Sequence, residues 1–567
     1  MKLSLSLLTF REDTVIWKQP IPASLHGDLI ELAERCRESS PELDFEGALI
    51  LGLRSAVQAL RFKLNHHAKV VLAAMVVAAL ALTLSTGAGA ASIVVNSLAD
   101  PGARGICALR DAITAANTKT ATNGCKAGNG YDTIRFSVTG TITLVSTLPQ
   151  VTDRRLTING PASPRITIDG DNEYPHIGVQ VLQVASCATL ELRNLTIAHG
   201  FSEPKGGGII NEGTLVIVDS TLADNITSGI FSTGLSGEGG AIYNDGVLTV
   251  VNSTFTGNQS IGPYEGAGEG GGIYNDGKLT VVKSIFSNNL GPADGGGIAN
   301  YKILRVTEST FSDNSAYGFG GGIDNVGTLN VTNSTFSNNF ANFDGGGIYN
   351  DDTLTVVNST FSGNSGLGDG ILNDGILKVT NSTFSGNSDG AIVNDDFASL
   401  KNTILASNVS SPSKNCTEFG TGTIIDAGYN ISDDASCKFS ATSSRNNTNP
   451  MLDPKGLQYN GGPTETIALD SESPAIDAIP VADCTDQASP PNRIITDQRG
   501  AIRPDAGEVQ CDIGAYEFQD FAGQPFCESK NIFALVRRFG SLETAASVLG
   551  FPSVKALLKA IQISCGG

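Results

Sequence analysis

Residues Gly345 to Asn364 read GGGIYNDDTLTVVNSTFSGN, and this phrase is one unit of a repeat that fills the centre of the chain. Its apolar residues are separated by polar ones, and its two β-rich runs are short and bounded by Asn, Asp and Gly, which is typical of short strands. Three such strands and three turns in about 25 residues make one coil of a parallel β-helix. The glycines supply positive φ angles where the coil turns tightly.

Two asparagines return in every unit between Gly206 and Asn408. The first series is Asn211, Asn244, Asn275, Asn300, Asn325, Asn350, Asn373 and Asn394, and it steps by 33, 31, 25, 25, 25, 23 and 21 residues. The second series is Asn225, Asn258, Asn289, Asn314, Asn339, Asn364, Asn387 and Asn408. Because stacked coils lie about 4.8 Å apart, amides at one position can hydrogen-bond from coil to coil. We expect ladders of this kind and no catalytic role for these asparagines.

The repeat predicts an all-β protein whose residues 132–410 form a right-handed parallel β-helix of roughly ten to twelve coils. Leucine-rich repeats are disfavoured because their leucine pattern is missing, and calcium-binding rolls because no nine-residue period is present. A propeller needs about 40 residues for each blade. We also expect a short helical cap at the N-terminal end of the solenoid and small helical segments at both ends of the chain.

Composition agrees with a solenoid and argues against a nucleic-acid partner. The 567 residues include 66 glycines, only 17% are charged, and the net charge is −20. Such a glycine content is typical of a turn-rich β structure. An acidic solenoid repels nucleic acid, so the sequence predicts no nucleic-acid role.

The N-terminal part of the chain carries an export signal. Residues 1–68 read as a helical extension that is either cytosolic or the product of a start site upstream of the true one. Residues 69–91 contain an apolar run, Val70 to Leu84, and the small residues Ala88 and Ala90, which together resemble a signal peptide cleaved before Ala91. The alternative is an uncleaved anchor, which would be the only membrane contact. Of the two, export with cleavage is favoured.

Residues 92–131 are expected to cap the solenoid. A strand at Ile93 is followed by CALRDAITAAN, Cys107 to Asn117, a short helix that would cover the open edge. The whole stretch IVVNSLADPGARGICALRDAITAAN resembles the CSLREA-type segment of bacterial exported β-helix proteins, which have polymorphic outer-membrane-protein-like repeats. It departs from that pattern at Ala108 and Asp111, where the pattern has Ser and Glu.

Residues 411–519 form a separate C-terminal unit in this interpretation. Its phrases NPMLDP, YNGGPTETIALDSESPAIDA and DQRGAIRP…CDIGAYEF, from Asn449 to Phe518, resemble the choice-of-anchor Q domain of bacterial surface β-helix proteins. This resemblance implies an exported bacterial protein and implies no activity. Residues 520–567 read as a small helical, disulfide-clamped tail. Leu542 to Ile561 resembles a helix-turn-helix, but a plain helical unit explains the same pattern.

The cysteines fit an oxidising destination, since nine of the ten follow the export signal. Close spacing predicts the pairs Cys107–Cys125, Cys416–Cys437, Cys484–Cys511 and Cys527–Cys565, although spacing alone does not establish connectivity. Cys187 is then left over.

Candidate chemistry is confined to acidic side chains. Glu238, Glu269, Asp294 and Asp344 each lie four residues before a repeated isoleucine, so they are expected to lie along one turn line. A solvated acidic edge explains them best, and the second interpretation is a weak Ca²⁺ site with oxygen ligands. We expect no other cofactor. His176 and His199 are expected to be ordinary loop residues, which leaves little material for a nucleophilic triad.

Three functions remain after this reading. The first is a secreted or cell-surface β-helix that serves without catalysis as an adhesin-like or envelope module and binds glycans or other envelope components. The second is a glycan-active, pectin lyase-like enzyme, either a polysaccharide lyase or a hydrolase. The third is a calcium-stabilised scaffold. The first is favoured because the recurrent residues are Asn, Gly, Ser, Thr, Ile, Val and Phe, none of which is an acid or base near neutral pH.

Overall fold

The computed structural model describes residues 91–171, 178–230, 232–262, 267–368, 370–408, 414–505, 508–519, 542–543 and 553–564. The chain divides into two compact units, Met1–Gly87 and Ala88–Gly567, and all described residues belong to the second. The expected extension 1–68, the apolar export run and the predicted pair Cys527–Cys565 lie outside the described residues, so these remain predictions. In the C-terminal tail one helix is described, α7 (Val554–Ser564).

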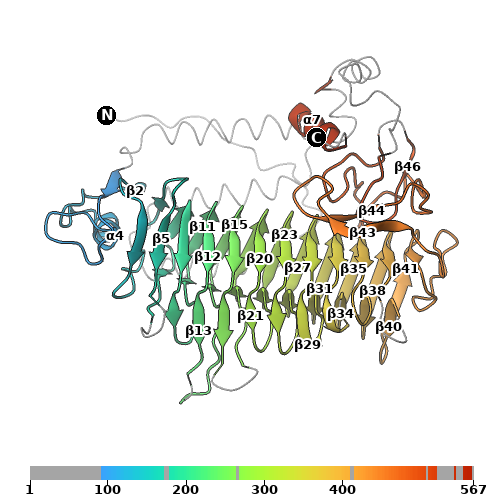
Figure 1. The fold of residues 1–567 in the computed structure, drawn as a ribbon, viewed down its shortest axis with the longest axis horizontal. Coiled ribbons are helices and arrows are strands. Elements are labelled where there is room, and N and C mark those ends of the chain that lie inside the picture. The colour runs from blue at the N-terminus through green and yellow to red at the C-terminus, as the bar shows by residue number, and fades with distance from the viewer. Residues whose placement is uncertain are drawn as a thin grey trace, which may run out of the picture. The chain divides into compact units, whose positions relative to one another are not determined.

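The described chain winds into a parallel β-helix whose coils stack along one axis (Figure 1). Each regular coil contributes strands to four sheets, which we number in the order in which a coil visits them. Sheet 1 consists of β1 (Ser92–Val95), β2 (Asp132–Phe136), β4 (Leu156–Asn159), β7 (Thr189–Arg193), β11 (Thr214–Val218), β15 (Val247–Val251), β19 (Lys278–Val282), β23 (Ile303–Thr307), β27 (Thr328–Thr332), β31 (Thr353–Val357), β35 (Ile376–Thr380), β38 (Phe397–Lys401) and β41 (Thr423–Asp426).

Sheet 2 lies across a short turn from sheet 1. It consists of β3 (Gly140–Thr143), β5 (Ile166–Asp169), β8 (Leu195–Ala198), β12 (Thr221–Ala223), β16 (Thr254–Thr256), β20 (Ile285–Ser287), β24 (Thr310–Ser312), β28 (Thr335–Ser337), β32 (Thr360–Ser362), β36 (Thr383–Ser385), β39 (Ile404–Ala406) and β42 (Ile431–Ser432).

Sheets 3 and 4 complete the coil. Sheet 3 consists of β9 (Phe201–Ser202), β13 (Ile226–Ser228), β17 (Gln259–Ile261), β21 (Leu290–Gly291), β25 (Ser315–Ala316), β29 (Phe340–Asp344) and β33 (Ser365–Leu367). Sheet 4 consists of β6 (Leu182–Val184), β10 (Ile209–Asn211), β14 (Ile242–Asn244), β18 (Ile273–Asn275), β22 (Ile298–Asn300), β26 (Ile323–Asn325), β30 (Ile348–Asn350), β34 (Ile371–Asn373), β37 (Ile392–Asn394) and β40 (Cys416–Glu418).

This architecture confirms the predicted parallel β-helix and differs from the prediction in detail. Where three strands were expected in each coil, regular coils have four, because the short segment after the second asparagine is extended and pairs as sheet 3. The stack also extends beyond residues 132–410 at both ends. Ser92 pairs with Thr133 at one end, and Phe397 pairs with Thr423 at the other. These end coils lack the repeated phrase, so periodicity did not reveal them.

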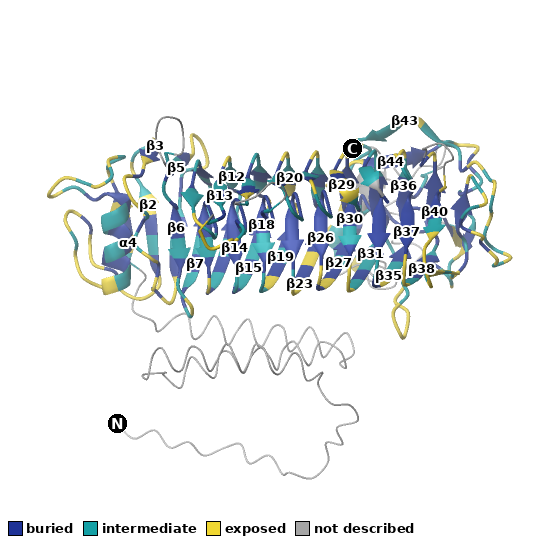
Figure 2. Cartoon of the chain, turned by 90° about the horizontal axis from the view of Figure 1, so that it is seen from below, coloured by how far each residue is buried: buried dark blue, intermediate teal, exposed yellow. Residues whose placement is uncertain are grey.

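The interior is made of columns of identical side chains. Phe255, Phe286, Phe311, Phe336, Phe361 and Phe384 stack on one another with ring centroids 4.6–4.9 Å apart, and each is fully buried. Figure 2 shows the buried strands of these coils in dark blue. Because side chains alternate across each strand, the Leu-x-Val pairs of sheet 1 and the isoleucines of sheet 4 complete the same core.

Both asparagine series form ladders inside this core. In the first series each Nδ2 donates to the Oδ1 of the next asparagine at 2.7 Å, from Asn211 to Asn394. In the second series the corresponding distances are 2.7–2.9 Å. A third ladder was not predicted. It links the serines at the start of the Ser-Thr-Phe phrase, as where Ser284 N donates to Ser309 Oγ at 3.1 Å.

The tight turns use two kinds of residue for positive φ. The first glycine of the Gly-Gly-Gly phrase has φ of 66° at Gly295 and 63° at Gly320, as the repeat predicted. The turn between sheets 1 and 2 instead uses polar residues, with φ of 52° at Asn333 and 48° at Asn358. Asparagine tolerates this left-handed region better than other residues with a Cβ, which explains its frequency at this second turn.

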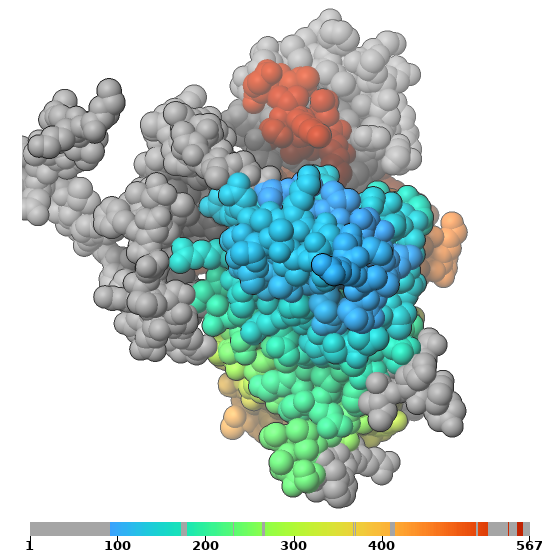
Figure 3. All heavy atoms as spheres, turned by 90° about the vertical axis from the view of Figure 1, so that its left-hand side faces the viewer, coloured from blue at the N-terminus to red at the C-terminus, as the bar shows by residue number. Residues whose placement is uncertain are grey.

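A short helix, α4 (Leu109–Thr118), lies at the N-terminal end of the stack, where the sequence placed it (Figure 1). Leu109, Ile113 and Ala116 are buried against the first strands. Lys119, just after the helix, forms ion pairs with Asp132 at 2.8 Å and Asp153 at 2.7 Å, and thereby ties the helix end to the first coils. Figure 3 views this end, where residues coloured blue cover the coils behind them.

Three of the predicted disulfides are confirmed, namely Cys107–Cys125, Cys416–Cys437 and Cys484–Cys511. The expectation that Cys187 is left over is wrong, because Cys187 is also disulfide-bonded. Pairing by closeness in sequence fails for this residue, since folding can bring together cysteines that are far apart along the chain.

The C-terminal unit folds back over the outer face of sheet 2. It contains two antiparallel pairs, β43 (Leu452–Gln458) with β44 (Thr466–Leu469), and β45 (Ile479–Pro480) with β46 (Gln510–Cys511). Thr335 donates to the carbonyl of Glu465 and Thr360 to Gln498 Oε1, both at 2.6 Å, while Thr383 accepts from Ala515 N at 3.0 Å. The outward threonines of these coils are therefore buried, whereas those of earlier coils are half-buried.

Candidate functional site

The most distinctive surface feature follows the outer face of sheet 4 and the turns on either side of it. We call it the aromatic-acidic strip. It consists of Lys205, Glu238, Glu269, Asp294, Phe319 and Asp344 before the sheet, Tyr243, Tyr274, Asp324 and Tyr349 on its strands, and Tyr301 and Asp374 after it. It contains all four side chains that the sequence nominated as an acidic line.

The register of the coils builds the first column of this strip. Lys205 pairs with Glu238 and Glu238 pairs with Glu269 as successive parallel bridges. The column continues because Gly270 N donates to the carbonyl of Asp294, and Gly320 N to the carbonyl of Asp344, both across one coil. Glu238, Glu269, Asp294 and Asp344 thus occupy equivalent positions, as their spacing from the repeated isoleucine predicted, with Phe319 among them.

The second column is recessed. The outward side chains on sheet 4 are shielded by the turns on both sides, so Tyr243 is only 7% exposed and Asp324 only 2% exposed. Outward side chains on sheet 1 are half-buried or exposed, for example along β23 and β27. This difference in exposure shows that the outward side chains of the strip are packed together and shielded from water.

Tyrosine rings stack along one half of the strip. The ring centroids of Tyr243 and Tyr274 are 5.5 Å apart, and those of Tyr274 and Tyr301 are 5.0 Å apart. The ammonium of Lys205 lies 3.9 Å from the Tyr243 centroid and 3.4 Å from the Glu238 carboxylate, so it covers the end of the stack.

Carboxylates accept hydrogen bonds from these hydroxyls and from the backbone. Tyr301 Oη donates to Glu269 Oε2 at 2.6 Å and so reaches from the turn after sheet 4 to the turn before it. Tyr349 Oη donates to Asp374 Oδ2 at 2.7 Å. Asp294 Oδ1 accepts from Phe319 N at 2.8 Å, which joins two neighbouring coils.

Burial and like charge raise the pKa of several carboxyl groups in the strip. Burial is the main cause for Glu269, where the charges of Asp294 and Glu238 add to it, and for Asp294. For Asp324, burial and then the charges of Asp294 and Glu269 hold the pKa well above its ordinary value. The three groups are therefore close enough to interact electrostatically. Each of them binds a proton more tightly than an exposed carboxylate does.

The other half of the strip is more apolar. The ring centroids of Phe319 and Tyr349 lie 4.6 Å apart, and those of Phe319 and Phe343 lie 6.3 Å apart. Beside them on sheet 3 and its turns, Phe343 is 55% exposed and Phe340 is 40% exposed. Exposed aromatic rings are common at binding surfaces, because they bury much area at little entropic cost.

One interpretation of the acidic line was a weak Ca²⁺ site, and this interpretation stays a prediction. Across the described ranges, no group of three or more His, Cys, Asp or Glu side chains converges as metal ligands would. The reason is visible in the contacts: Glu238 pairs with Lys205, Glu269 accepts from Tyr301, and Asp294 accepts from a backbone amide. The four carboxylates lie along one column but do not converge on one position.

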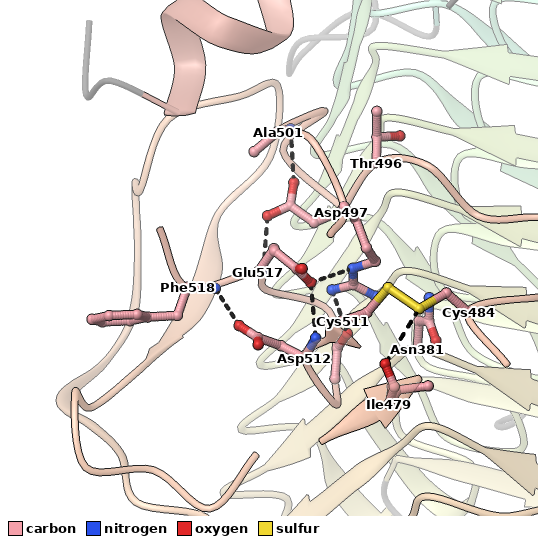
Figure 4. A network of polar contacts seen from close by, with 12 residues as sticks. Asn381, Ile479, Cys484, Thr496, Asp497, Ala501, Cys511, Asp512, Glu517 and Phe518 are labelled. Carbon is pink, nitrogen blue, oxygen red and sulfur yellow. Dashed lines mark hydrogen bonds and ion pairs between the residues drawn. A yellow bond between two sulfur atoms is a disulfide. The ribbon is translucent and has the colours of Figure 1, made fainter. Parts of the chain in front are cut away.

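A second polar cluster lies in the C-terminal unit and serves its structure (Figure 4). The buried Arg503 side chain lies 2.8 Å from Glu517 Oε2, and Glu517 Oε2 also accepts from Asp512 N at 3.1 Å. Asp497 accepts from Ala501 N at 2.9 Å and from Glu517 N at 3.0 Å. All of these groups are at least 98% buried, so the DQRG and CDIGAYEF phrases supply internal polar contacts that hold the unit together.

Of the histidines, the structure describes His199, which does not belong to the strip. His199 Nδ1 lies 3.1 Å from Asp169 Oδ2 on the turns beside sheet 2, away from the strip in sequence and in sheet. His176 lies outside the described residues. Sequence reasoning found the acidic column but missed the tyrosines. Tyr243, Tyr274 and Tyr349 lie at a variable position between the repeated isoleucine and asparagine, and Tyr301 directly follows Asn300.

Comparison with known proteins identifies the fold but does not identify a function. The family model described as the right handed beta helix region matches residues 178–361, a range that contains the strip except for Asp374. The solenoid is accordingly a right-handed parallel β-helix. No curated protein and no solved structure matches the chain. Within the described residues, neither helix is both long and apolar enough to cross a membrane.

Proposed function

We propose that this protein is an exported β-helix protein, secreted or held at the bacterial cell surface, that binds extended glycan chains along the aromatic-acidic strip without cleaving them. The strip carries this proposal. It places the carboxylates of Glu238, Glu269 and Asp294 at equivalent positions of successive coils, about 4.8 Å apart, beside stacked tyrosine rings. An extended polymer can therefore repeat similar weak contacts along the strip.

Export is supported by the disulfides and by two resemblances. The three described disulfides indicate an oxidising environment. The CSLREA-type segment at the N-terminal end and the choice-of-anchor-like unit at the C-terminal end both favour a bacterial surface protein. An adhesin-like or envelope role follows from combining such a destination with a long binding flank.

The absence of catalysis is proposed because several carboxyl groups of the strip accept hydrogen bonds from neighbouring groups of the protein. Glu269 and Asp374 each accept a tyrosine hydroxyl, and Asp294 accepts a backbone amide. No histidine or arginine belongs to the strip, since Arg305, the only arginine between Asn194 and Asn408, lies on β23 in sheet 1. A polysaccharide lyase would need a base and a cation beside an acidic sugar, and this strip is poor in both.

One observation favours glycan hydrolysis as a second candidate. Burial raises the pKa of Glu269, Asp294 and Asp324, and a carboxyl group with a raised pKa can serve as a general acid. The same raised pKa follows from crowding alone, so the two candidates must be separated by product formation.

The test is a glycan array with the purified protein, run beside reducing-sugar and unsaturated-product assays on the glycans that it retains. We expect retention without product. Tyr301→Phe removes the hydroxyl that bonds Glu269 and keeps the ring, and it should weaken retention by about tenfold or less, the equivalent of one ordinary hydrogen bond. Tyr429→Phe is the matched control, because Tyr429 Oη bonds Asp483 at 2.9 Å outside the strip.

Three results would contradict the proposal. The protein could retain no glycan, or Tyr429→Phe could weaken retention as much as Tyr301→Phe. Alternatively, the wild-type protein could release cleavage products that the Glu269→Gln variant does not release. That result would establish hydrolysis in place of simple binding.

A further inference from the structure

The aromatic-acidic strip holds far more negative than positive charge. Its one cation, Lys205, pairs with Glu238 at the edge of the strip. Lys302 lies in the turn beside the strip, with its ammonium 3.3 Å from the Asp276 carboxylate. Across the described ranges, no ammonium or guanidinium group pairs with Glu269, Asp294 or Asp324. Burial raises the pKa of all three carboxyl groups, and neighbouring negative charges add to this effect for Glu269 and Asp324.

Asp324 is the clearest sign that the site is built for a partner. Its side chain is 98% buried on the outer face of β26, and we see no hydrogen bond to it from any described residue. A buried carboxyl group without a partner is costly, and a bound cation is one of the ways in which proteins offset that cost. Its nearest charges, Asp294 and Glu269, belong to the same part of the strip.

Lys205 shows what kind of cation fits. Its ammonium lies over the Tyr243 ring at 3.9 Å and beside the Glu238 carboxylate at 3.4 Å, so a tyrosine and a carboxylate already hold one primary ammonium within the chain. Further along the strip, the Tyr301 hydroxyl donates to Glu269, and the charges of Asp294 and Asp324 lie close by. Among the described residues, this group of carboxyl groups beside a tyrosine includes no lysine.

A metal ion fits this site less well than an organic ammonium. The carboxylates occupy successive coils and do not converge as metal ligands within the described residues. They are instead spread along the axis in steps of about 4.8 Å, which suits amino groups repeated along a polymer.

We propose that the strip is specific for glycans that carry free amino groups, and that Glu269, Asp294 and Asp324 receive their ammonium groups. This inference rests on the proposed glycan-binding function and names its ligand class. Uronic acids and sulfated or phosphorylated glycans are excluded by charge repulsion, and N-acetylated sugars lack the charge that the three carboxylates require.

The test compares three oligomers by calorimetry with the full-length protein: a glucosamine hexamer, its fully N-acetylated counterpart and a galacturonate hexamer. We expect the glucosamine hexamer to bind at least about tenfold more tightly than the acetylated one, the effect of one good charge-assisted contact. Added salt should reduce this preference, and the galacturonate hexamer should not bind.

Two variants locate the effect. Asp324→Asn and Glu269→Gln remove one negative charge each at nearly constant shape, and each should abolish the preference for the amine. Neither variant should unfold the protein, because Asp324→Asn relieves repulsion and should raise the melting temperature. The matched control is Asp313→Asn, which removes the same charge outside the strip and introduces the residue found at the equivalent positions Asn288 and Asn338.

The outcomes separate this inference from the function on which it rests. Equal binding of the two glucosamine-based hexamers overturns the amine specificity and leaves glycan binding intact. Failure to bind any glycan on an array overturns both. The preference for the glucosamine hexamer could survive in Asp324→Asn and Glu269→Gln, or it could be lost equally in Asp313→Asn. Either result shows that the carboxyl groups of the strip do not recognise the amine.

Discussion

The interior of the solenoid and the aromatic-acidic strip are built by the same coils, yet their side chains follow different rules. Inside, one column reads Phe at every coil from Phe255 to Phe384, and each ring finds an identical ring 4.6–4.9 Å away. On the strip, the column before sheet 4 reads Lys, Glu, Glu, Asp, Phe, Asp from Lys205 to Asp344. Identical side chains at equivalent positions of neighbouring coils stabilise the fold. Positions where the side chain varies from coil to coil are not required by the fold and are available for binding or catalysis.

The same contrast appears in how polar groups are satisfied. Each interior asparagine donates to the next one and is fully buried, so the ladder accounts for its own hydrogen bonds. Asp324 is almost as deeply buried but has only other carboxyl groups as its nearest charges. A ladder is therefore complete without a ligand, and this part of the strip is not.

The largest expected effect is in the phenylalanine column. Phe311→Ala should lower the free energy of unfolding by about 3–5 kcal/mol, because it leaves a cavity between two stacked rings. The control is Phe343→Ala on the strip side, where the ring is 55% exposed and the cost should stay below about 0.5 kcal/mol. Urea titration of both variants measures the difference. Similar costs at the two positions would remove the distinction between interior and strip.

The next effect is in the asparagine ladder. Asn300→Ala should cost about 1–3 kcal/mol, because it leaves the Asn275 amide and the Asn325 carbonyl oxygen buried without their partner. Asn330→Ala is the matched control, since Asn330 faces outward on β27 and joins no ladder. Urea titration again reads out the result, and a cost at Asn330 as large as that at Asn300 would argue against the ladder as a source of stability.

A smaller effect of opposite sign is expected in the strip and depends on pH. The folded pKa of Asp324 is raised above its ordinary value of 3.8, so its contribution to stability is fully present below that value and is lost as pH rises through the folded pKa. Asp324→Asn does not titrate there. The variant should match the wild type near pH 3.5 and melt at a higher temperature near pH 8, by differential scanning calorimetry. A variant less stable than the wild type at pH 8 would mean that the Asp324 carboxylate has a stabilising partner.

The smallest effect separates the two ends of the tyrosine stack. Lys205→Met removes an ammonium whose side chain is 41% exposed, so the loss of stability should be well under about 1 kcal/mol. Its effect on an amine-bearing ligand should be the reverse, since the Tyr243 ring and Glu238 then become available to the ligand. Calorimetric titration with the glucosamine hexamer should show binding at least as tight as in the wild type. Weaker binding would place Lys205 among the groups that contact the glycan.

Much of the fold followed from the chain alone. The spacing of Asn300, Asn325 and Asn350 predicted a solenoid and its ladder, and cysteines close in sequence predicted three disulfides correctly. These predictions worked because each interior side chain packs on its own counterpart one coil away, so the period of the sequence is the period of the structure. The short strands of sheet 3, the serine ladder and the bond at Cys187 were missed, because each depends on contacts that have no repeated signature.

What the amino-acid order settled for this protein is the solenoid, its interior columns and the alignment of Glu238, Glu269, Asp294 and Asp344. Folding settled the rest. Tyr301 reaches Glu269 across sheet 4, the C-terminal unit covers Thr360, and flanking turns bury Asp324. None of these has a local cause: each arises where side chains from different coils or units meet, and burial and charge at such a meeting are set by all the neighbours together.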